Sequence, residues 1–434
     1  MRGGGGIKPR AAETIKNAAI ALLTISAIIF GWRTVVSGTS ADPDAISEFF
    51  AQILGGGRAP GRSGDEARES PADERPLCIV ITNESGERFG AKYDAAQLEL
   101  VYGRTSSVFG EAFSSASGFG PADAGEWRGA LDRPGIYYAY PSGVSIEMLD
   151  AWFGTNMSPV GGASELDVRR MCVAFGRERD RLLFQDAAGG FYGADTASLG
   201  EQPQIVGLFG GNGARFAFET DNGRSDPYAV LMPDAAHPVI AAANPMSDSG
   251  NLDAVLAELG ISNQLNSSYT DADGTTVFVS NTFTFSLDGN GDAVYRRTAS
   301  AAQPASERER GQAAAVTAAR AAADGILAGV CGDAALVLAG VAHAEQDAYI
   351  VSFAYSVAGG SIYVGGDGSA AEATVKDGVV TEMALVFRQY AITGETVPLL
   401  PERQAYAAAG GEFELCYFDS GGELLAPEWV VFKG

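Results

Sequence analysis

The sequence predicts an α+β protein: one N-terminal transmembrane helix, followed by extracytoplasmic domains in which antiparallel sheets pack against helices. Two patterns carry the prediction for the exported body. Short apolar or alternating segments end at turn-forming residues such as Asp377-Gly378, and stretches with i, i+3 apolar spacing, as at residues 95–102, lie between them. A third observation, the long apolar run Asn17 to Val36, predicts the transmembrane helix.

The apolar run decides the predicted topology. A membrane-spanning helix needs about 20 mostly apolar residues, and Lys16 and Arg33 bracket sixteen residues without formal charge. Trp32 suits the membrane interface. The tail at residues 1–16 carries four basic residues and one acidic residue. The positive-inside rule therefore predicts a single-pass protein of the cell membrane with a cytoplasmic N-terminus and an extracytoplasmic body.

Two other interpretations of this run compete with the anchor. Thr39-Ser40-Ala41 offers the small residues of a signal-peptide cleavage site, and a buried amphipathic helix is the third choice. The anchor is favoured because the run exceeds the roughly 7–15 residues of a signal-peptide core. Small side chains in the anchor would permit close helix–helix contact, although they also suit an anchor without a partner. These candidate contact residues are Ala18, Ala19, Ser26 and Ala27.

Composition limits the classes of function. With 434 residues, 46% of them hydrophobic, the chain can bury more than one core. Its net charge is −24, and because residues 1–33 hold five basic residues and one acidic residue, the rest of the chain has a net charge of −28. Such a body repels nucleic acid and anionic lipid, so a nucleic-acid partner is not expected. Solubility explains the acidic surface better than a specific cationic ligand does.

Cysteine and histidine usage predicts neither a metal site nor a cofactor. The four cysteines contain no C-x-x-C pair, which excludes a dense disulfide scaffold and a zinc site that sequence can reveal. One or two disulfides and buried free thiols both remain open. The two histidines have no neighbour at ligand spacing. These residues are Cys78, Cys172, Cys331, Cys416, His237 and His343.

The region before the body and the first exported domain follow from local patterns. Residues 37–76 are predicted as a juxtamembrane helix and a flexible linker, because residues 55–76 are rich in Gly, Arg, Glu and Pro. The first domain is predicted at residues 77–203. Its predicted strands are 77–82, 134–141, 171–175, 181–186 and 190–194, and its predicted helices are 93–113 and 145–153.

Two more exported domains are predicted at residues 204–302 and 303–434. The second is strand-rich, with strands at 216–220, 228–232, 275–280, 282–287 and 293–297 and a helix at 251–259. The third places one main helix, 311–329, against an antiparallel sheet, with a short helix at 401–409. Its strands are 334–341, 349–357, 361–365, 371–376, 379–390, 413–418 and 429–432, with tight turns at Ala358-Gly359-Gly360 and Asp377-Gly378.

Three motifs are better explained by structure than by chemistry. Asp288 to Asp292 spaces oxygens like a calcium loop, but an EF-hand needs Gly and Glu where Ala293 and Ala299 stand, so a hairpin turn is predicted. The glycine-rich run Gly207 to Gly213 lacks the Lys-Ser/Thr of a phosphate loop. The alternating residues 349–355 predict a sheet face packed on a helix. With no catalytic motif in sequence, an enzyme is not predicted.

Several segments, taken together, resemble the YycH/YycI family of membrane-anchored extracytoplasmic regulators of a sensor histidine kinase. They extend over nearly the whole chain and are similar in order and texture to long, clostridial-type members. The sequence departs from the family at Ala358-Gly359-Gly360, where a bulkier apolar residue is expected after the glycine. The segments are the basic tail with its anchor, Arg88–Tyr93, Ile136–Pro141, Leu149–Gly154, Tyr269–Val279 through Leu287, and Tyr355–Val364 to Tyr390.

The resemblance implies a non-enzymatic regulator without catalytic residues or cofactor. Its implied partners are a sensor histidine kinase of a two-component system and a related membrane-anchored regulator, reached through the transmembrane helix and the exported domains. The alternative is an exported cell-envelope ligand-binding protein or enzyme of unknown substrate. A deep acidic cleft would favour that alternative, whereas a shallow sheet surface would favour the regulator.

Overall fold

The computed structural model describes residues 75–157, 166–176, 179–199, 202–220, 226–233, 236–261, 267–298, 311–344, 348–365, 368–409 and 412–432. These belong to one compact unit, Glu69–Gly434. The predicted tail 1–16, anchor 17–36 and most of the region 37–76 lie outside the described residues, as do Ala18, Ala19, Ser26 and Ala27. Within the described ranges, no helix is long and apolar enough to cross a membrane.

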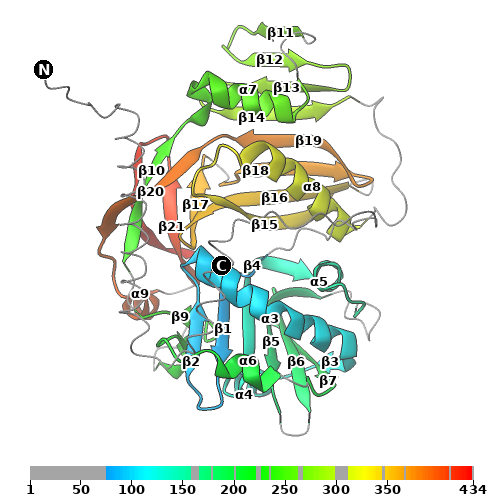
Figure 1. Cartoon of the computed structure of the whole chain (residues 1–434), viewed down its shortest axis with the longest axis vertical. Helices are drawn as coiled ribbons and strands as arrows, with labels where there is room; N and C mark the ends of the chain where they lie inside the picture. Colours follow the sequence, from blue (N-terminus) through cyan, green and yellow to red (C-terminus); the bar gives the residue numbers. More distant parts are fainter. Residues whose placement is uncertain are drawn as a thin grey trace, which may run out of the picture. The chain divides into compact units, whose positions relative to one another are not determined.

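The first large sheet has seven strands in the order β2-β1-β4-β5-β6-β7-β3, and every neighbouring pair is antiparallel (Figure 1). Three helices pack against it: α3 (Ala95–Ser115), α4 (Ala124–Leu131) and α5 (Ile146–Phe153). The strands are β1 (Cys78–Thr82), β2 (Arg88–Ala91), β3 (Ser117–Pro121), β4 (Gly135–Ser145), β5 (Asp167–Ala174), β6 (Asp180–Asp186) and β7 (Phe191–Thr196).

Both faces of this sheet are buried, which explains the unbroken apolar sequence of β1. Ile79 and Ile81 share a core with Val101 and Phe109 of α3, whereas alternate residues of β1 share a second core with Trp127 of α4. Successive strand residues point to opposite faces, so a strand covered on both sides has no polar positions.

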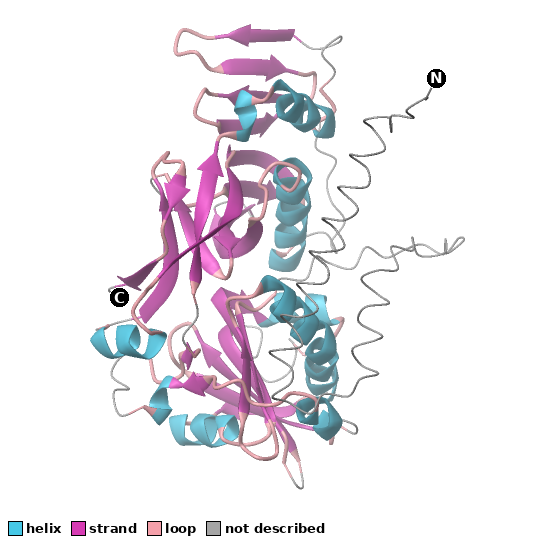
Figure 2. Cartoon of the chain, turned by 60° about the vertical axis from the view of Figure 1, so that its left-hand side comes forward, coloured by secondary structure: helices cyan, strands magenta, loops and turns pink. Residues whose placement is uncertain are grey.

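The second large sheet has eleven strands, and β17 and β21 form its one parallel pair among the described strands. Helices α7 (Ser249–Glu258) and α8 (Gln312–Leu327) lie along it on one side (Figure 2). Its strands are β11 (Ser267–Thr270), β12 (Thr276–Val279), β13 (Phe283–Leu287), β14 (Asp292–Arg297), β15 (Ala335–Ala344), β16 (Ala348–Val357), β17 (Gly360–Val364), β18 (Ala371–Lys376), β19 (Val379–Val386), β21 (Glu412–Asp419) and β23 (Glu428–Phe432).

Smaller elements join the two large sheets. Strand β10 (His237–Ala243) pairs with β20 (Gln389–Val397) and β22 (Leu424–Leu425), and β8 (Arg215–Phe216) pairs with β9 (Val230–Leu231). The remaining helices are α6 (Gln202–Gly207), α9 (Glu402–Ala408), η2 (Ala217–Glu219) and η3 (Pro245–Ser247). Strand β14 pairs with β19, so the second sheet contains strands from both sides of residue 302. The division into three exported domains stays a prediction.

The α+β class and several local predictions are confirmed. Asp377 and Gly378 have φ values of 51° and 71°, as a type I′ turn requires. The Asp288 carboxylate accepts hydrogen bonds from the backbone N–H groups of residues 290–292, which confirms the hairpin turn. Val351, Phe353 and Tyr355 are buried. All four cysteines are buried free thiols, and burial raises the pKa of Cys78 to about 12.

Several element predictions are wrong in extent. The strand predicted at 228–232 is only two residues long, Val230–Leu231. The strand predicted at 216–220 is only two residues long and continues as η2, because the Glu219 carboxylate caps the Phe216 N–H. The strand predicted to end at Pro141 continues to Ser145, and the proline lies in an irregularity of pairing between Ala139 and Val144. A proline is tolerated there because no ladder hydrogen bond needs its missing N–H.

The strand predicted at 379–390 is divided into β19 and β20, with Arg388 between them. Other elements had no prediction, among them strands β3 and β10 and helices α4 and α6. Helix α4 is short and amphipathic, and its N-cap is Asp123, whose side chain accepts from the Glu126 N–H.

Candidate functional site

A buried polar junction forms where segments far apart in the sequence meet. We call it the Lys92 junction and define it by five residues: Lys92 and Tyr93 between β2 and α3, His237 at the start of β10, Glu402 at the start of α9, and Trp429 in β23. These five residues lie up to about 340 positions apart in the sequence. The junction therefore depends on tertiary structure, not on local pattern.

Glu402 is the centre of the Lys92 junction. Its side chain is 4% exposed, and its carboxylate accepts from Lys92 Nζ at 2.6 Å, Tyr93 Oη at 2.7 Å and the Met232 N–H at 2.7 Å. Lys92 Nζ also donates to the Val230 carbonyl at 3.0 Å. Burial lowers the pKa of Lys92, but the charge of Glu402 outweighs it, so this pKa lies above its ordinary value.

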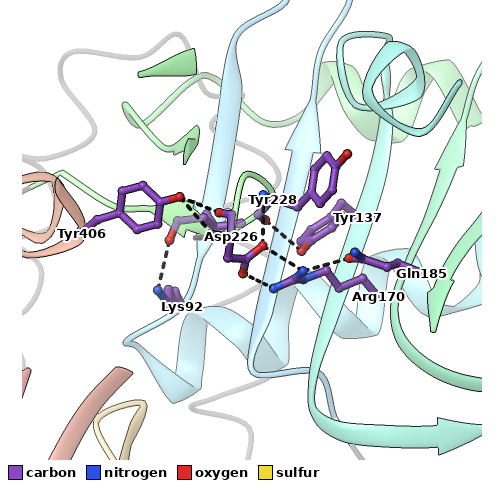
Figure 3. Close-up of polar contacts among 8 residues, drawn as sticks. Lys92, Tyr137, Arg170, Gln185, Asp226, Tyr228 and Tyr406 are labelled. Atoms are coloured by element: carbon purple, nitrogen blue, oxygen red, sulfur yellow. Dashed lines mark hydrogen bonds and ion pairs between the residues drawn. The ribbon is translucent and has the colours of Figure 1, made fainter. Parts of the chain in front are cut away.

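A second polar network attaches the same helix to the first sheet (Figure 3). Arg170 of β5 forms a two-pronged ion pair with Asp226 and donates to Gln185 at 2.8 Å. The Asp226 carbonyl accepts from Tyr406 Oη at 2.8 Å. Glu402 and Tyr406 are four residues apart on α9, so they lie on one face of that helix. Through these two side chains, helix α9 is attached to the segment 226–232.

The turn between β16 and β17 completes the Lys92 junction. Gly359 has a φ of 69°, and a Cβ added there would lie 2.5 Å from the Lys92 carbonyl oxygen and 2.7 Å from Tyr93 Cα. Two requirements therefore coincide at Gly359: a left-handed backbone and a close approach between two chain segments.

Gly359→Ala is expected to lower the free energy of unfolding by about 2–4 kcal/mol, the sum of a left-handed backbone penalty and overpacking. The matched control is Gly86→Ala. Gly86 has a φ of 78° and nothing within 4 Å of an added Cβ, so only the backbone penalty applies. Urea unfolding of both variants measures the difference. Equal losses would contradict a tight contact at Gly359.

A small cavity opens beside the Lys92 junction. Its volume is about 100 Å³. The imidazole of His237 stands edge-on to the rings of Tyr93 and Trp429, with centroid distances of 5.1 Å and 5.6 Å. Burial lowers the pKa of His237, so the imidazole is neutral at pH 7. The lining residues are Tyr93, Pro233, His237, Leu399, Leu400, Pro401, Glu402 and Trp429.

An open groove of about 540 Å³ runs between helices α7 and α8 and strands β13, β14 and β19. Most of the lining residues are apolar, and α8 contributes mainly small ones. The lining residues are Glu258, Leu259, Phe283, Tyr295, Arg297, Ala318, Ala321, Ala322, Gly325, Ile326, Gly378, Val379, Val380 and Met383.

The Lys92 junction was not predicted from the sequence. Lys92 and Tyr93 fall in the segment Arg88–Tyr93, Tyr93 also begins the predicted helix 93–113, and His237 has no neighbour at ligand spacing. The local indication is an acidic residue, Glu402, at the second position of the predicted helix 401–409. In the part of the chain that the structure describes, no three His, Cys, Asp or Glu side chains are grouped to hold a metal ion.

Two of three comparisons with known proteins find no match. No protein-family model matches the chain, and no curated protein does. Among solved structures, the crystal structure of YycH from Bacillus subtilis is similar, with a TM-score of 0.47 and 8% sequence identity. That similarity covers 83% of this chain and 94% of the YycH chain.

Proposed function

We propose that the chain is a non-enzymatic, membrane-anchored regulator of a two-component sensor histidine kinase. Residues 17–36 anchor it in the cell membrane as a single-pass protein, with a cytoplasmic N-terminus and an extracytoplasmic body. Its partners are the kinase and a related membrane-anchored regulator. The ordered resemblance to the YycH/YycI family, from Arg88–Tyr93 to Tyr355–Val364, supports this proposal.

Two of the segments quoted for the resemblance are in contact. The segment Arg88–Tyr93 and the segment Tyr355–Val364 are more than 250 residues apart, yet Gly359 packs against the backbone of Lys92 and Tyr93. The contact is made at Ala358-Gly359-Gly360, where the sequence departs from the family, so the order of the segments along the chain carries the proposal.

The character of the polar groups also supports a regulator. The Glu402 carboxylate accepts hydrogen bonds from three donors, and Asp226 is paired with Arg170. Such groups hold chain segments together and leave little capacity for substrate. The larger hollow is an open groove lined by many apolar side chains with Glu258 and Arg297 among them, which suits protein recognition better than a deep acidic cleft does.

The direct test is co-purification. The native full-length chain is extracted from its own membranes in mild detergent and captured, and the captured proteins are identified by mass spectrometry. We expect a sensor histidine kinase in the capture. A matched capture with an unrelated single-pass protein of similar abundance corrects for background. A capture without any histidine kinase would contradict the proposal.

A second experiment separates the anchor from the body. Residues 17–36 are replaced by an unrelated membrane-spanning helix, and kinase output is measured. Altered output is expected if Ala18, Ala19, Ser26 and Ala27 contact the kinase helices. Unchanged output would contradict the helix contact and would assign recognition to the exported body.

The second candidate function is an exported ligand-binding protein of the cell envelope. The cavity beside the Lys92 junction favours it, because aromatic rings and a buried histidine converge on a space of about 100 Å³. Capture of no kinase, together with saturable binding of a small molecule in this cavity, would favour the second candidate over the first.

A further inference from the structure

The wall of the cavity beside the Lys92 junction contains one polar side chain, His237, whose ring does not form a hydrogen bond with another described residue. His237 is 4% exposed and lines the cavity. The imidazole has ring contacts with Tyr93 and Trp429. Its ring nitrogens are therefore available to form a hydrogen bond with a molecule that enters the cavity.

The other polar groups of the cavity wall are already occupied. Glu402 accepts from Lys92, Tyr93 and the Met232 N–H, and its charge is compensated by Lys92. The Trp429 Nε1–H donates to the Leu400 carbonyl at 2.8 Å. A charged ligand would therefore find no unpaired opposite charge here. The neutral imidazole offers one donor and one acceptor.

We infer that this cavity binds a small, neutral, largely apolar molecule with one hydroxyl group, such as a phenol, and that the hydroxyl forms its hydrogen bond with His237. The rings of Tyr93 and Trp429 and the side chains of Leu399 and Leu400 line the space for the apolar part. A dry cavity of about 150 Å³ admits benzene, and the space here is smaller, about 100 Å³. A ring therefore enters only in part, and the rest of it projects toward solvent beside Leu400, a lining residue that is 57% exposed.

The test compares two probes that differ only in the hydroxyl group. The full-length chain in lipid nanodiscs is titrated with 4-fluorophenol and with fluorobenzene, and binding is followed by fluorine NMR. We expect saturable binding of both probes, with 4-fluorophenol bound about five- to tenfold more tightly because of the hydrogen bond. His237→Phe keeps an aromatic ring but should remove this preference and leave fluorobenzene binding within about twofold.

Leu399→Trp is the matched control, since a larger side chain fills the cavity and should abolish saturable binding of both probes. Partition into the lipid is the same for all variants and is subtracted with this control. Equal affinity of the two probes for the native chain, or a hydroxyl preference that survives in His237→Phe, would overturn the inference. Absence of saturable binding would also overturn it. None of these outcomes depends on the kinase partner, so the regulator proposal is tested separately.

Discussion

Replacing Glu402 by alanine is expected to lower the free energy of unfolding by about 3–5 kcal/mol, the range for removing one partner of a buried ion pair. The Lys92 ammonium, 24% exposed, would lose its counter-charge. Tyr93 Oη and the Met232 N–H would lose their acceptor. Denaturant unfolding of the wild type and the variant measures the loss through the shift in midpoint.

Three variants separate charge from packing at Glu402. Glu402→Gln keeps an acceptor for Tyr93 and Met232 but removes the charge, so we expect an intermediate loss. Lys92→Met combined with Glu402→Gln removes the unpaired ammonium and should be more stable than Glu402→Ala. Glu395→Ala removes an exposed carboxylate and should change stability by less than about 0.5 kcal/mol. A Glu402→Ala loss no larger than that of Glu395→Ala would refute the ion-pair account.

Elements with a complete local pattern could be predicted from the sequence. Helix α5 has Ser145 as its N-cap, accepting from the Met148 N–H, and it ends at Gly154 with a φ of 67°. Ser145 stands immediately before the apolar spacing of the helix, where N-cap residues are expected. The turn at Asp377-Gly378 is similar, because its two residues alone determine the turn type. Such signals lie within a few residues of one another.

The Lys92 junction could not be predicted for the opposite reason. Lys92 and Glu402 are 310 residues apart, and each one separately resembles an ordinary surface charge. Only the packing of α9 beside residues 226–232 brings them into contact. The pairing of β14 with β19 could not be predicted for the same reason, because it depends on strand register between segments far apart in the sequence.

A further buried ion pair links Arg388, which lies just before β20, to Asp419 at the end of β21. Arg388 donates from Nε and Nη2 to the two oxygens of Asp419 at 2.6 Å and 2.8 Å. Tyr390 Oη donates to the same carboxylate at 2.9 Å, and so does the Gly421 N–H. The Asp419 side chain is 1% exposed. Burial lowers the pKa of Arg388, but the hydrogen bonds and charge of Asp419 raise it above its ordinary value, so the guanidinium stays charged.

Asp419→Ala is therefore expected to lower the free energy of unfolding by about 3–5 kcal/mol, because it leaves the Arg388 guanidinium buried without a counter-charge. Asp273→Ala, at an exposed turn carboxylate, is the matched control and should lose less than about 0.5 kcal/mol. Adding Arg388→Met to Asp419→Ala removes the stranded charge and should recover part of the loss. If the double variant is no more stable than Asp419→Ala, the cost comes from lost packing and the Tyr390 hydrogen bond, and the ion-pair explanation is wrong.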